Sequence, residues 1–331
     1  MANANAVQRR RASSSSSGAA ALRASLLKRD KQAAKEGATA STSLPLLTFA
    51  DVSGDPALAY LADSDYILTG YRHRPGCCAA LGSFFTLHNE TANIWTHLLG
   101  AGVVCRLMWC VAFAPASVGL TAGAGCTPAP VWPVLTFLCG AALCLLLSVL
   151  YHGLFTASAA WDALLNKLDY IGISALIFTS NVPPMYYAFS QRHPATGLGY
   201  IGFSLLVNAV AGVMGTVPFF RASAWRHLGA LAYIVCGATG AIPLLHFMWL
   251  SSGAGSAGEW ALAWQLFWRT LLMGAQYIVG AALFGLRIPE RFSPGSFDFF
   301  PSHAFFHILV VTAVLTHWGS VQQLWVERSR C

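Results

Sequence analysis

The last long apolar run of the chain begins with Pro301-Ser302-His303-Ala304-Phe305-Phe306-His307-Ile308 and continues to about residue 323. A run of about 20 apolar residues is long enough to cross a bilayer as a helix. In such a helix His303 and His307 lie on one face, one turn apart, because residues i and i+4 are neighbours. Two imidazoles so placed can bind one metal ion, although hydrogen bonds to neighbouring helices can equally satisfy a histidine inside a bundle.

Similar apolar runs occupy most of the chain. Of its 331 residues, 56% are hydrophobic and only 10% are charged, which is too apolar for a soluble domain of this length. The runs are continuous rather than alternating, so they predict helices and not the strands of a barrel. Pro183 and Pro184 should kink or end the third helix. The predicted fold is an all-α integral membrane bundle of seven transmembrane helices, at about residues 93–113, 131–152, 168–189, 197–219, 227–250, 263–285 and 303–323.

The segments outside the runs divide the rest of the chain. Residues 1–65 are predicted to be a disordered tail, rich near its start in Arg, Ser and Ala, since polar low-complexity sequence cannot bury a core; a transit peptide is the alternative. Residues 66–92 are a juxtamembrane segment, in which residues 80–92 are expected to form a short helix lying on the membrane. Residues 93–323 are the transmembrane domain, and residues 324–331 are a short C-terminal tail.

Charged residues predict how the chain is oriented. Lys and Arg are concentrated before the first run and in the loops after the second, fourth and sixth runs, whereas the opposite side has only Arg192, Arg328 and Arg330. The positive-inside rule therefore predicts a cytosolic N-terminus and an extracellular or lumenal C-terminus, in the plasma membrane or an endomembrane. This asymmetry accounts for most of the net charge of +7, so no nucleic-acid partner is implied. Asn89-Glu90-Thr91 has the spelling of a glycosylation sequon but falls on the cytosolic side, where we expect it to be unmodified.

The predicted topology brings four polar residues to one depth of the membrane. His152 ends the second run, Asp169 begins the third, and His303 and His307 begin the seventh, all on the cytosolic side. With a rise of about 1.5 Å per residue, they fall within a layer about 5–10 Å deep. Three neutral imidazoles give zinc three ligands and leave a fourth position for water, whose pKa zinc lowers to about 7. The three histidines are therefore the predicted metal ligands.

Two further residues are candidates for catalysis. The Asp169 carboxylate can act as general base, bind the water or orient a ligand histidine; alternatively it caps its helix or pairs with Lys167. Ser148, one turn before His152, can hold a substrate oxygen, or it serves only in the packing of small residues between helices. We assign candidate catalytic roles to Asp169 and Ser148.

Several motifs resemble the progestin and adipoQ receptor family, which includes adiponectin receptors, membrane progestin receptors, fungal zinc-homeostasis proteins and bacterial hemolysin III-like proteins. The resemblance covers about residues 66–323, and residues 182–189 resemble the adiponectin-receptor and fungal branch. Two departures from the family pattern are Phe300-Pro301, which replaces a Gly-rich lead, and Ala304, which stands where the family usually has Gln; neither removes a ligand. The motifs are Gly70-Tyr71-Arg72, residues 87–100, Ser148 with His152, residues 168–172, residues 287–298 and residues 302–307.

The resemblance implies a seven-helix bundle with a zinc ion near the cytosolic face, bound by His152, His303 and His307, with Asp169 beside its water. Because adiponectin receptors are linked to ceramidase-type hydrolysis, the implied function is a receptor that hydrolyses a lipid amide such as ceramide. Two alternatives are a signalling receptor whose zinc is purely structural and a protein of zinc or lipid homeostasis. The expected partners are a membrane sphingolipid, an extracellular ligand and a second copy of the chain.

Overall fold

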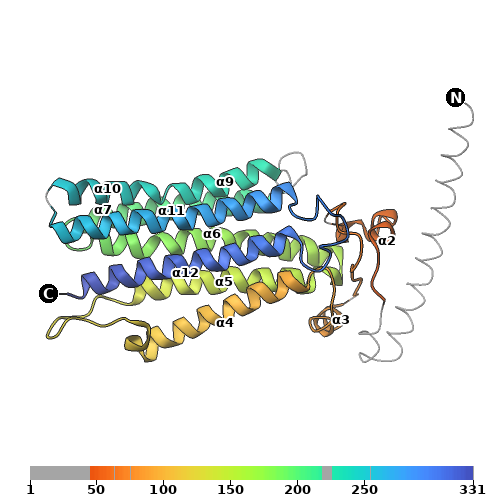
Figure 1. Cartoon of the computed structure of the whole chain (residues 1–331), viewed down its shortest axis with the longest axis horizontal. Helices are drawn as coiled ribbons and strands as arrows, with labels where there is room; N and C mark the ends of the chain where they lie inside the picture. The colour runs from red at the N-terminus through yellow and green to blue at the C-terminus, as the bar shows by residue number, and fades with distance from the viewer. Residues whose placement is uncertain (1–44, 63, 75, 218–225, 254, 331) are drawn as a thin grey trace, which may run out of the picture. The chain divides into compact units, whose positions relative to one another are not determined.

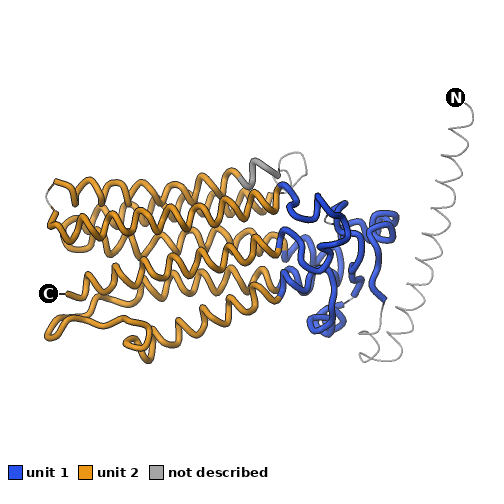
Figure 2. The backbone as a smooth tube through the Cα atoms, in the orientation of Figure 1, with its two compact units in different colours: residues 1–94, 150–165, 286–303 blue, residues 95–149, 166–285, 304–331 orange. Residues whose placement is uncertain are grey.

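The computed structural model describes residues 45–62, 64–74, 76–217, 226–253 and 255–330, with backbone alone for residues 226–230. All regular elements in this part of the chain are helical, and an isolated bridge between Leu47 and Tyr71 is its one β pairing. The chain divides into two compact units, which Figure 2 shows in different colours.

The first unit contains the described residues within 1–94, 150–165 and 286–303. Its short helices are α2 (Phe49–Gly54), η2 (Ala59–Leu61), α3 (Cys77–Gly82) and η4 (Phe155–Ala157). Thr48 and Asp51 begin α2 with a capping box, in which each side chain bonds the other residue's backbone N–H. An apolar cluster holds these pieces together, and its buried members are Leu47, Val52, Leu58, Leu61, Ile67, Tyr71 and Phe155.

Three predicted boundaries differ from the structure. Residues 45–65 were assigned to the tail, yet α2 and η2 pack in the apolar cluster; the disorder predicted for residues 1–44 lies outside the described residues. The helix expected over residues 80–92 is shorter and begins earlier, as α3, and residues 83–90 form turns and irregular backbone. The tail expected from residue 324 is helical as far as Arg328.

Long helices supply most of the second unit, which comprises residues 95–149, 166–285 and 304–331. They run alongside one another in Figure 1, and a short 3-10 helix, η3 (Pro115–Val118), lies in the connection between the first two of them. Their bounds are α4 (Thr91–Phe113), α5 (Trp132–Leu154), α6 (Ala159–Phe189), α7 (Pro194–Thr216), α9 (Arg226–Ala238), α10 (Ala241–Gly253), α11 (Ala257–Leu286) and α12 (Ser302–Arg328).

Among the described residues, six segments are long and apolar enough to cross a membrane. They correspond to α4, α5 with η4, α7, residues 231–253, α11 and α12, so the fifth predicted span is two helices, α9 and α10. The third predicted span lies within α6, which has 31 residues but is not among the six. Pro183 and Pro184 do not end α6, which continues to Phe189. The count of seven spans and the orientation of the termini stay predictions.

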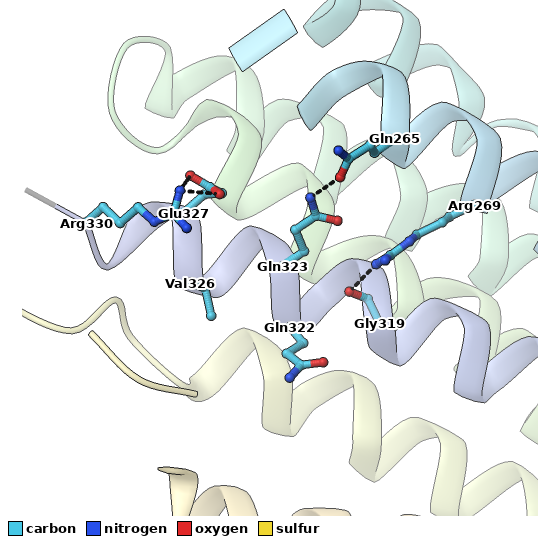
Figure 3. A pocket seen from close by; sticks show the side chains of 8 residues that line it. All are labelled: Gln265, Arg269, Gly319, Gln322, Gln323, Val326, Glu327 and Arg330. Atoms are coloured by element: carbon cyan, nitrogen blue, oxygen red, sulfur yellow. Dashed lines mark hydrogen bonds and ion pairs between the residues drawn. The ribbon is translucent and has the colours of Figure 1, made fainter. Parts of the chain in front are cut away.

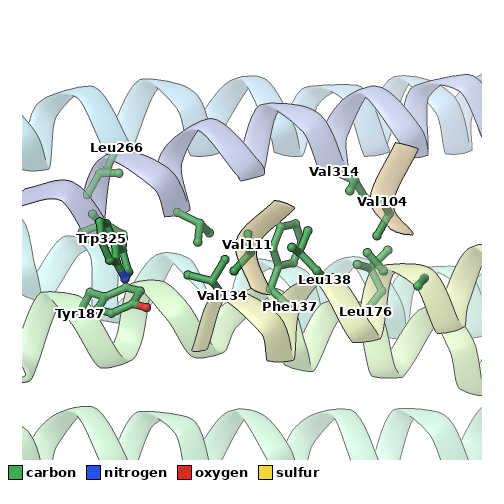
Figure 4. Close-up of a cluster of buried hydrophobic side chains, with 14 of the residues drawn as sticks. Val104, Val111, Val134, Phe137, Leu138, Leu176, Tyr187, Leu266, Val314 and Trp325 are labelled. Carbon is green, nitrogen blue, oxygen red and sulfur yellow. The ribbon is translucent and has the colours of Figure 1, made fainter. Parts of the chain in front are cut away.

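The core of the bundle combines side chains of α4, α5, α6, α11 and α12, as Figure 4 shows. Lipid tails are as apolar as these side chains, so close packing is what favours helix association inside a bilayer. Glycines allow α5 and α6 to approach closely. A Cβ added at Gly140 would overlap the side chain of Thr179, and one added at Gly172 would lie 3.1 Å from the Cα of Cys144.

Candidate metal centre

Three histidines from two helices form the candidate metal centre. His152 lies in the last turn of α5, and His303 and His307 lie one turn apart at the start of the continuous helix α12. Their ligand atoms all lie within 4.8 Å of one another, and the rings of His152 and His303 meet edge-on with centroids 4.9 Å apart. His152 and His307 are buried and His303 is half-buried. This group can hold a metal ion.

Glu90, at the entrance to α4, fixes the orientation of His152. Its Oε2 lies 2.7 Å from Nδ1 of His152 and accepts a hydrogen bond of 2.7 Å from the Asn93 amide. Burial by itself raises the pKa of the Glu90 carboxyl, but the hydrogen bonds from His152 and Asn93, together with the positive charges of protonated His152 and His303, lower that pKa to about 2. An anionic acceptor requires Nδ1 to carry the proton, so the lone pair of a neutral His152 is on Nε2. Carboxylates commonly hold metal-binding histidines in this way.

Arg72 anchors the end of α5. Its Nη2 donates to the carbonyl of His152 at 2.6 Å, its Nη1 donates to Ser83 Oγ at 2.6 Å, and the side chain is 1% exposed. Burial lowers the pKa of Arg72 to about 10, and Glu90 opposes this shift, so the guanidinium stays charged at neutral pH. A cation on the last carbonyls of a helix complements the helix dipole. Arg72 therefore helps to hold the turn that carries His152.

Two buried carboxylates fix the start of α12, which carries His303. Glu290 accepts hydrogen bonds from the backbone N–H of Ser302, at 2.9 Å, and from its hydroxyl. An anion at a helix N-terminus is favourable because the first N–H groups have no partner within the helix. Asp298 accepts from the backbone N–H groups of Leu68, at 2.9 Å, and Thr69, at 2.8 Å. The loop before α12 is thereby fastened at both of its ends.

Residues of α4 surround the His307 ring. The rings of His97 and His307 stack with centroids 3.6 Å apart and planes 8° apart. Thr96 Oγ1 lies 3.4 Å from Nδ1 of His307. These contacts restrict the rotation of the His307 imidazole and so favour one orientation of its nitrogens.

The two candidate catalytic residues lie on neighbouring helices. Ser148 is 2% exposed and lies one turn before His152 on α5, and Asp169 is half-buried on α6. The close approach of Gly172 to Cys144 puts both residues at one level, because each is about one turn from that contact on antiparallel helices. Asp169 is not a member of the group of ligand atoms. The catalytic roles of Asp169 and Ser148 stay predictions.

Sequence reasoning missed the charged residues that hold the histidines in place. It treated Glu90 only as part of a sequon and gave no role to Arg72, Glu290 or Asp298, although all four stand inside the quoted motifs. For Glu90 a signal was present. A carboxylate at the edge of an apolar run, on the same predicted side as His152, is costly unless it is paired.

Known proteins share this region of the chain. Residues 85–318 match the family model described as Haemolysin-III related. The chain is 33% identical over 273 residues to the adiponectin receptor protein of Drosophila melanogaster, which covers 81% of this chain and 58% of that protein. It is 34% identical over 270 residues to progestin and adipoQ receptor-like protein 1 of Caenorhabditis elegans, with 80% and 58% covered.

A plant relative is matched over more of its length. Heptahelical transmembrane protein 1 of Arabidopsis thaliana is 31% identical over 269 residues, with 79% of this chain and 77% of that protein covered. The chain thus spans less than two thirds of the fly and worm relatives and about three quarters of the plant one. The family match includes Glu90 and all three histidines. Together with its apolar helices, this shows that the chain is an integral multi-pass membrane protein that belongs to the haemolysin-III-related family, which confirms the resemblance seen in its motifs.

Proposed function

We propose that this chain is a receptor of the adiponectin and progestin type that binds zinc through His152, His303 and His307 and hydrolyses a lipid amide. The observation that carries the proposal is the cluster of three imidazoles with His152 held by a buried carboxylate. Imidazole nitrogens suit zinc, and a set of three protein ligands is typical of catalytic rather than structural zinc sites.

Zinc in such a site supplies a Lewis acid that polarises a carbonyl and acidifies water. The side chains of this chain would orient the ligands, transfer the protons and bind the substrate oxygen. Glu90 keeps His152 in the tautomer that can coordinate. Asp169 would accept a proton from the water that attacks the amide carbon, and it would then protonate the departing nitrogen as the C–N bond breaks. Ser148 would donate a hydrogen bond to the substrate oxygen.

The substrate class follows from the location of the site. The three histidines lie at the ends of helices that can cross a membrane, so a substrate would arrive from the bilayer. A lipid amide such as ceramide fits this route. We further propose seven spans, with α6 as the additional one and the N-terminus in the cytosol, which agrees with the name heptahelical given to the plant relative. An extracellular ligand and self-association are proposed partners.

Metal content and lipid turnover test the function together. Purified full-length protein should contain about one zinc per chain and release fatty acid from ceramide, and His303→Ala should lose the metal. His307→Ala and Asp169→Ala should both lose hydrolysis, although Asp169→Ala should keep its zinc. Undiminished turnover in both of these variants would contradict the enzymatic proposal.

A structural role for zinc is the second candidate. It is favoured by the origin of the three histidines, which come from two different helices that one bound ion would hold together. In this case zinc would join α5 to α12, and an external ligand would act by shifting the helices. Chelation would then lower the melting temperature of the protein, and no lipid product would accumulate at any zinc occupancy.

A further inference from the structure

A polar cavity of about 360 Å³ lies between α11 and α12, near the end of the bundle where the chain terminates. Gln265 and Arg269 of α11 face the C-terminal turns of α12, including Gln323 and Glu327, and Arg330 just beyond the end of that helix (Figure 3). Its volume is within the range of small-molecule sites, about 300–1,000 Å³. Polar side chains on adjacent membrane helices are unusual unless they have a ligand or a partner.

Tryptophans mark the depth of this cavity in the membrane. Trp260, Trp264 and Trp268 follow one another at intervals of four residues along α11 and are 41%, 46% and 55% exposed, and Trp249 at the end of α10 is 70% exposed. Exposed tryptophans gather at the level of the lipid headgroups, where the ring is apolar and the N–H meets water. Arg269 directly follows Trp268, so the cavity lies at headgroup depth.

The cavity carries one net positive charge. Glu327 and Arg330 form an ion pair at 2.7 Å, so these two charges offset each other. Arg269 is half-buried, and its Nη1 donates to the carbonyl of Gly319 at 2.7 Å. Within the described part of the chain no carboxylate pairs with Arg269. A guanidinium has five N–H donors, so most of them remain available to an anion.

Neutral donors lie beside that charge. The amide of Gln323 donates to the side-chain carbonyl of Gln265, which leaves the Gln265 amide N–H groups to donate elsewhere. Gly319 lets Arg269 lie flat against α12, since a Cβ there would come within 3.3 Å of Nη1. Figure 3 shows two neighbouring pairs between the helices, Gln265 with Gln323 and Arg269 with Gly319.

We propose that this cavity binds the phosphodiester of a membrane phospholipid, with Arg269 as the anchor and the amides of Gln265 and Gln323 as additional donors. Guanidinium matches phosphate because its planar N–H groups make two parallel hydrogen bonds. The acyl chains of the lipid would lie along the exposed apolar faces of α11. This site is distinct from the three histidines and does not depend on the proposed hydrolysis.

Native mass spectrometry of delipidated full-length protein tests the proposal. The probes are phosphatidylglycerol, a diacylglycerol with the same acyl chains, and soluble glycerol 3-phosphate. Wild-type protein should bind phosphatidylglycerol at least about tenfold more tightly than either of the others, and Arg269→Met should lose about tenfold, as expected for the loss of a charged hydrogen bond. The affinity of Arg269→Lys should be intermediate, because lysine keeps the positive charge but lacks the planar N–H groups that make two parallel hydrogen bonds.

Arg192→Met is the matched control. Arg192 pairs with Glu259 at 3.0 Å near the start of α11 and does not line the cavity, so this variant should bind as the wild type does. Should Arg269→Met fail to fold, Gln265→Ala with Gln323→Ala should still weaken binding several-fold. Equal binding of the diacylglycerol, or an equal loss in Arg192→Met, would overturn the phosphate site. Equal binding of glycerol 3-phosphate would overturn the lipid as its source.

Discussion

A single carboxylate determines which ring nitrogen of His152 carries the proton and which is free to bind a metal. Glu90 is buried, anionic and 2.7 Å from Nδ1 of His152, but it is not one of the three proposed zinc ligands. Removing the charge should therefore act on the metal only through His152, without removing a ligand.

Glu90→Gln should weaken zinc binding by about 10- to 100-fold, the usual effect of losing a carboxylate that supports a ligand histidine. The amide no longer compels Nδ1 to carry the proton, so His152 spends less time in the coordinating tautomer. Competition with a chromophoric chelator measures the affinity. Glu259→Gln, at the start of α11, is the control and should leave it unchanged. An unaltered affinity in Glu90→Gln would show that Glu90 does not support the metal.

His88 should make the protein sensitive to acid. It is fully buried, and burial, with the charge of Arg72, lowers its pKa from 6.5 to about 3. Between these values the unfolded chain binds a proton that the folded chain does not, so stability should fall as the pH falls, by up to about 1.4 kcal/mol per pH unit. The Glu90 carboxyl, with a pKa of about 2, adds a loss of the same sign only below about pH 4.5.

The measurement is the melting temperature at pH 7.5, 6.5, 5.5 and 4.5. His88→Gln should give a flatter dependence than the wild type below pH 6.5, whatever its stability at pH 7.5. His193→Gln, which changes an exposed histidine at the start of α7, should keep the wild-type dependence. Parallel curves for His88→Gln and the wild type would rule out His88 as the cause.

At the residue scale, the sequence was enough to group residues whose proximity depends only on the order and direction of the helices. His152, His303 and His307 each lie at the end of an apolar run, so counting runs was enough to group them. Glu90 needed more, because its partner is 62 positions away and only the fold brings the two side chains together. Arg72 and Asp298 likewise act on residues far along the chain.

Packing of α5 against α6 determines how closely the elements of the bundle approach. Gly140→Ala should destabilise the protein by about 1–3 kcal/mol, since the new methyl overlaps the Thr179 side chain and the helices must separate. Gly102→Ala on α4 is the control, because a Cβ there meets nothing within 4 Å and alanine favours the helix.

The apparent melting temperature of the purified protein measures both variants. Adding Thr179→Ala to Gly140→Ala removes the hydroxyl and methyl that the new group meets, so the double variant should recover part of the loss. If Gly140→Ala is as stable as Gly102→Ala, the contact between these helices is looser than the structure indicates.

Element boundaries could be predicted where hydropathy changes sharply. The first and second runs, 93–113 and 131–152, agree with α4 and α5 to within two residues at each end. The start of α6 could not be found in this way, since its first turns contain Asp162, Asn166 and Lys167 and read as a loop. The end of α12 was missed because Gln322, Gln323 and Glu327 are polar, yet their helix continues along the cavity.

For the whole molecule, the topology depends on whether α6 crosses the membrane. At about 1.5 Å per residue its 31 residues extend well beyond the roughly 30 Å of a bilayer core, although its polar residues keep it out of the set of six candidate spans. Six spans would leave both ends of the chain on the same side of the membrane. Seven would leave them on opposite sides, so the location of the two termini distinguishes the counts.

Small epitope tags at residue 1 and after residue 331 should therefore differ in accessibility. In intact cells, or in sealed vesicles if the protein resides in an internal membrane, only the C-terminal tag should lie on the extracellular or lumenal side. The N-terminal tag should be cytosolic because the Lys and Arg residues near it resist translocation. Permeabilised membranes, in which both tags must react, are the control. Two tags on the same side would exclude seven spans, and with them the proposed orientation of the histidine cluster toward the cytosol.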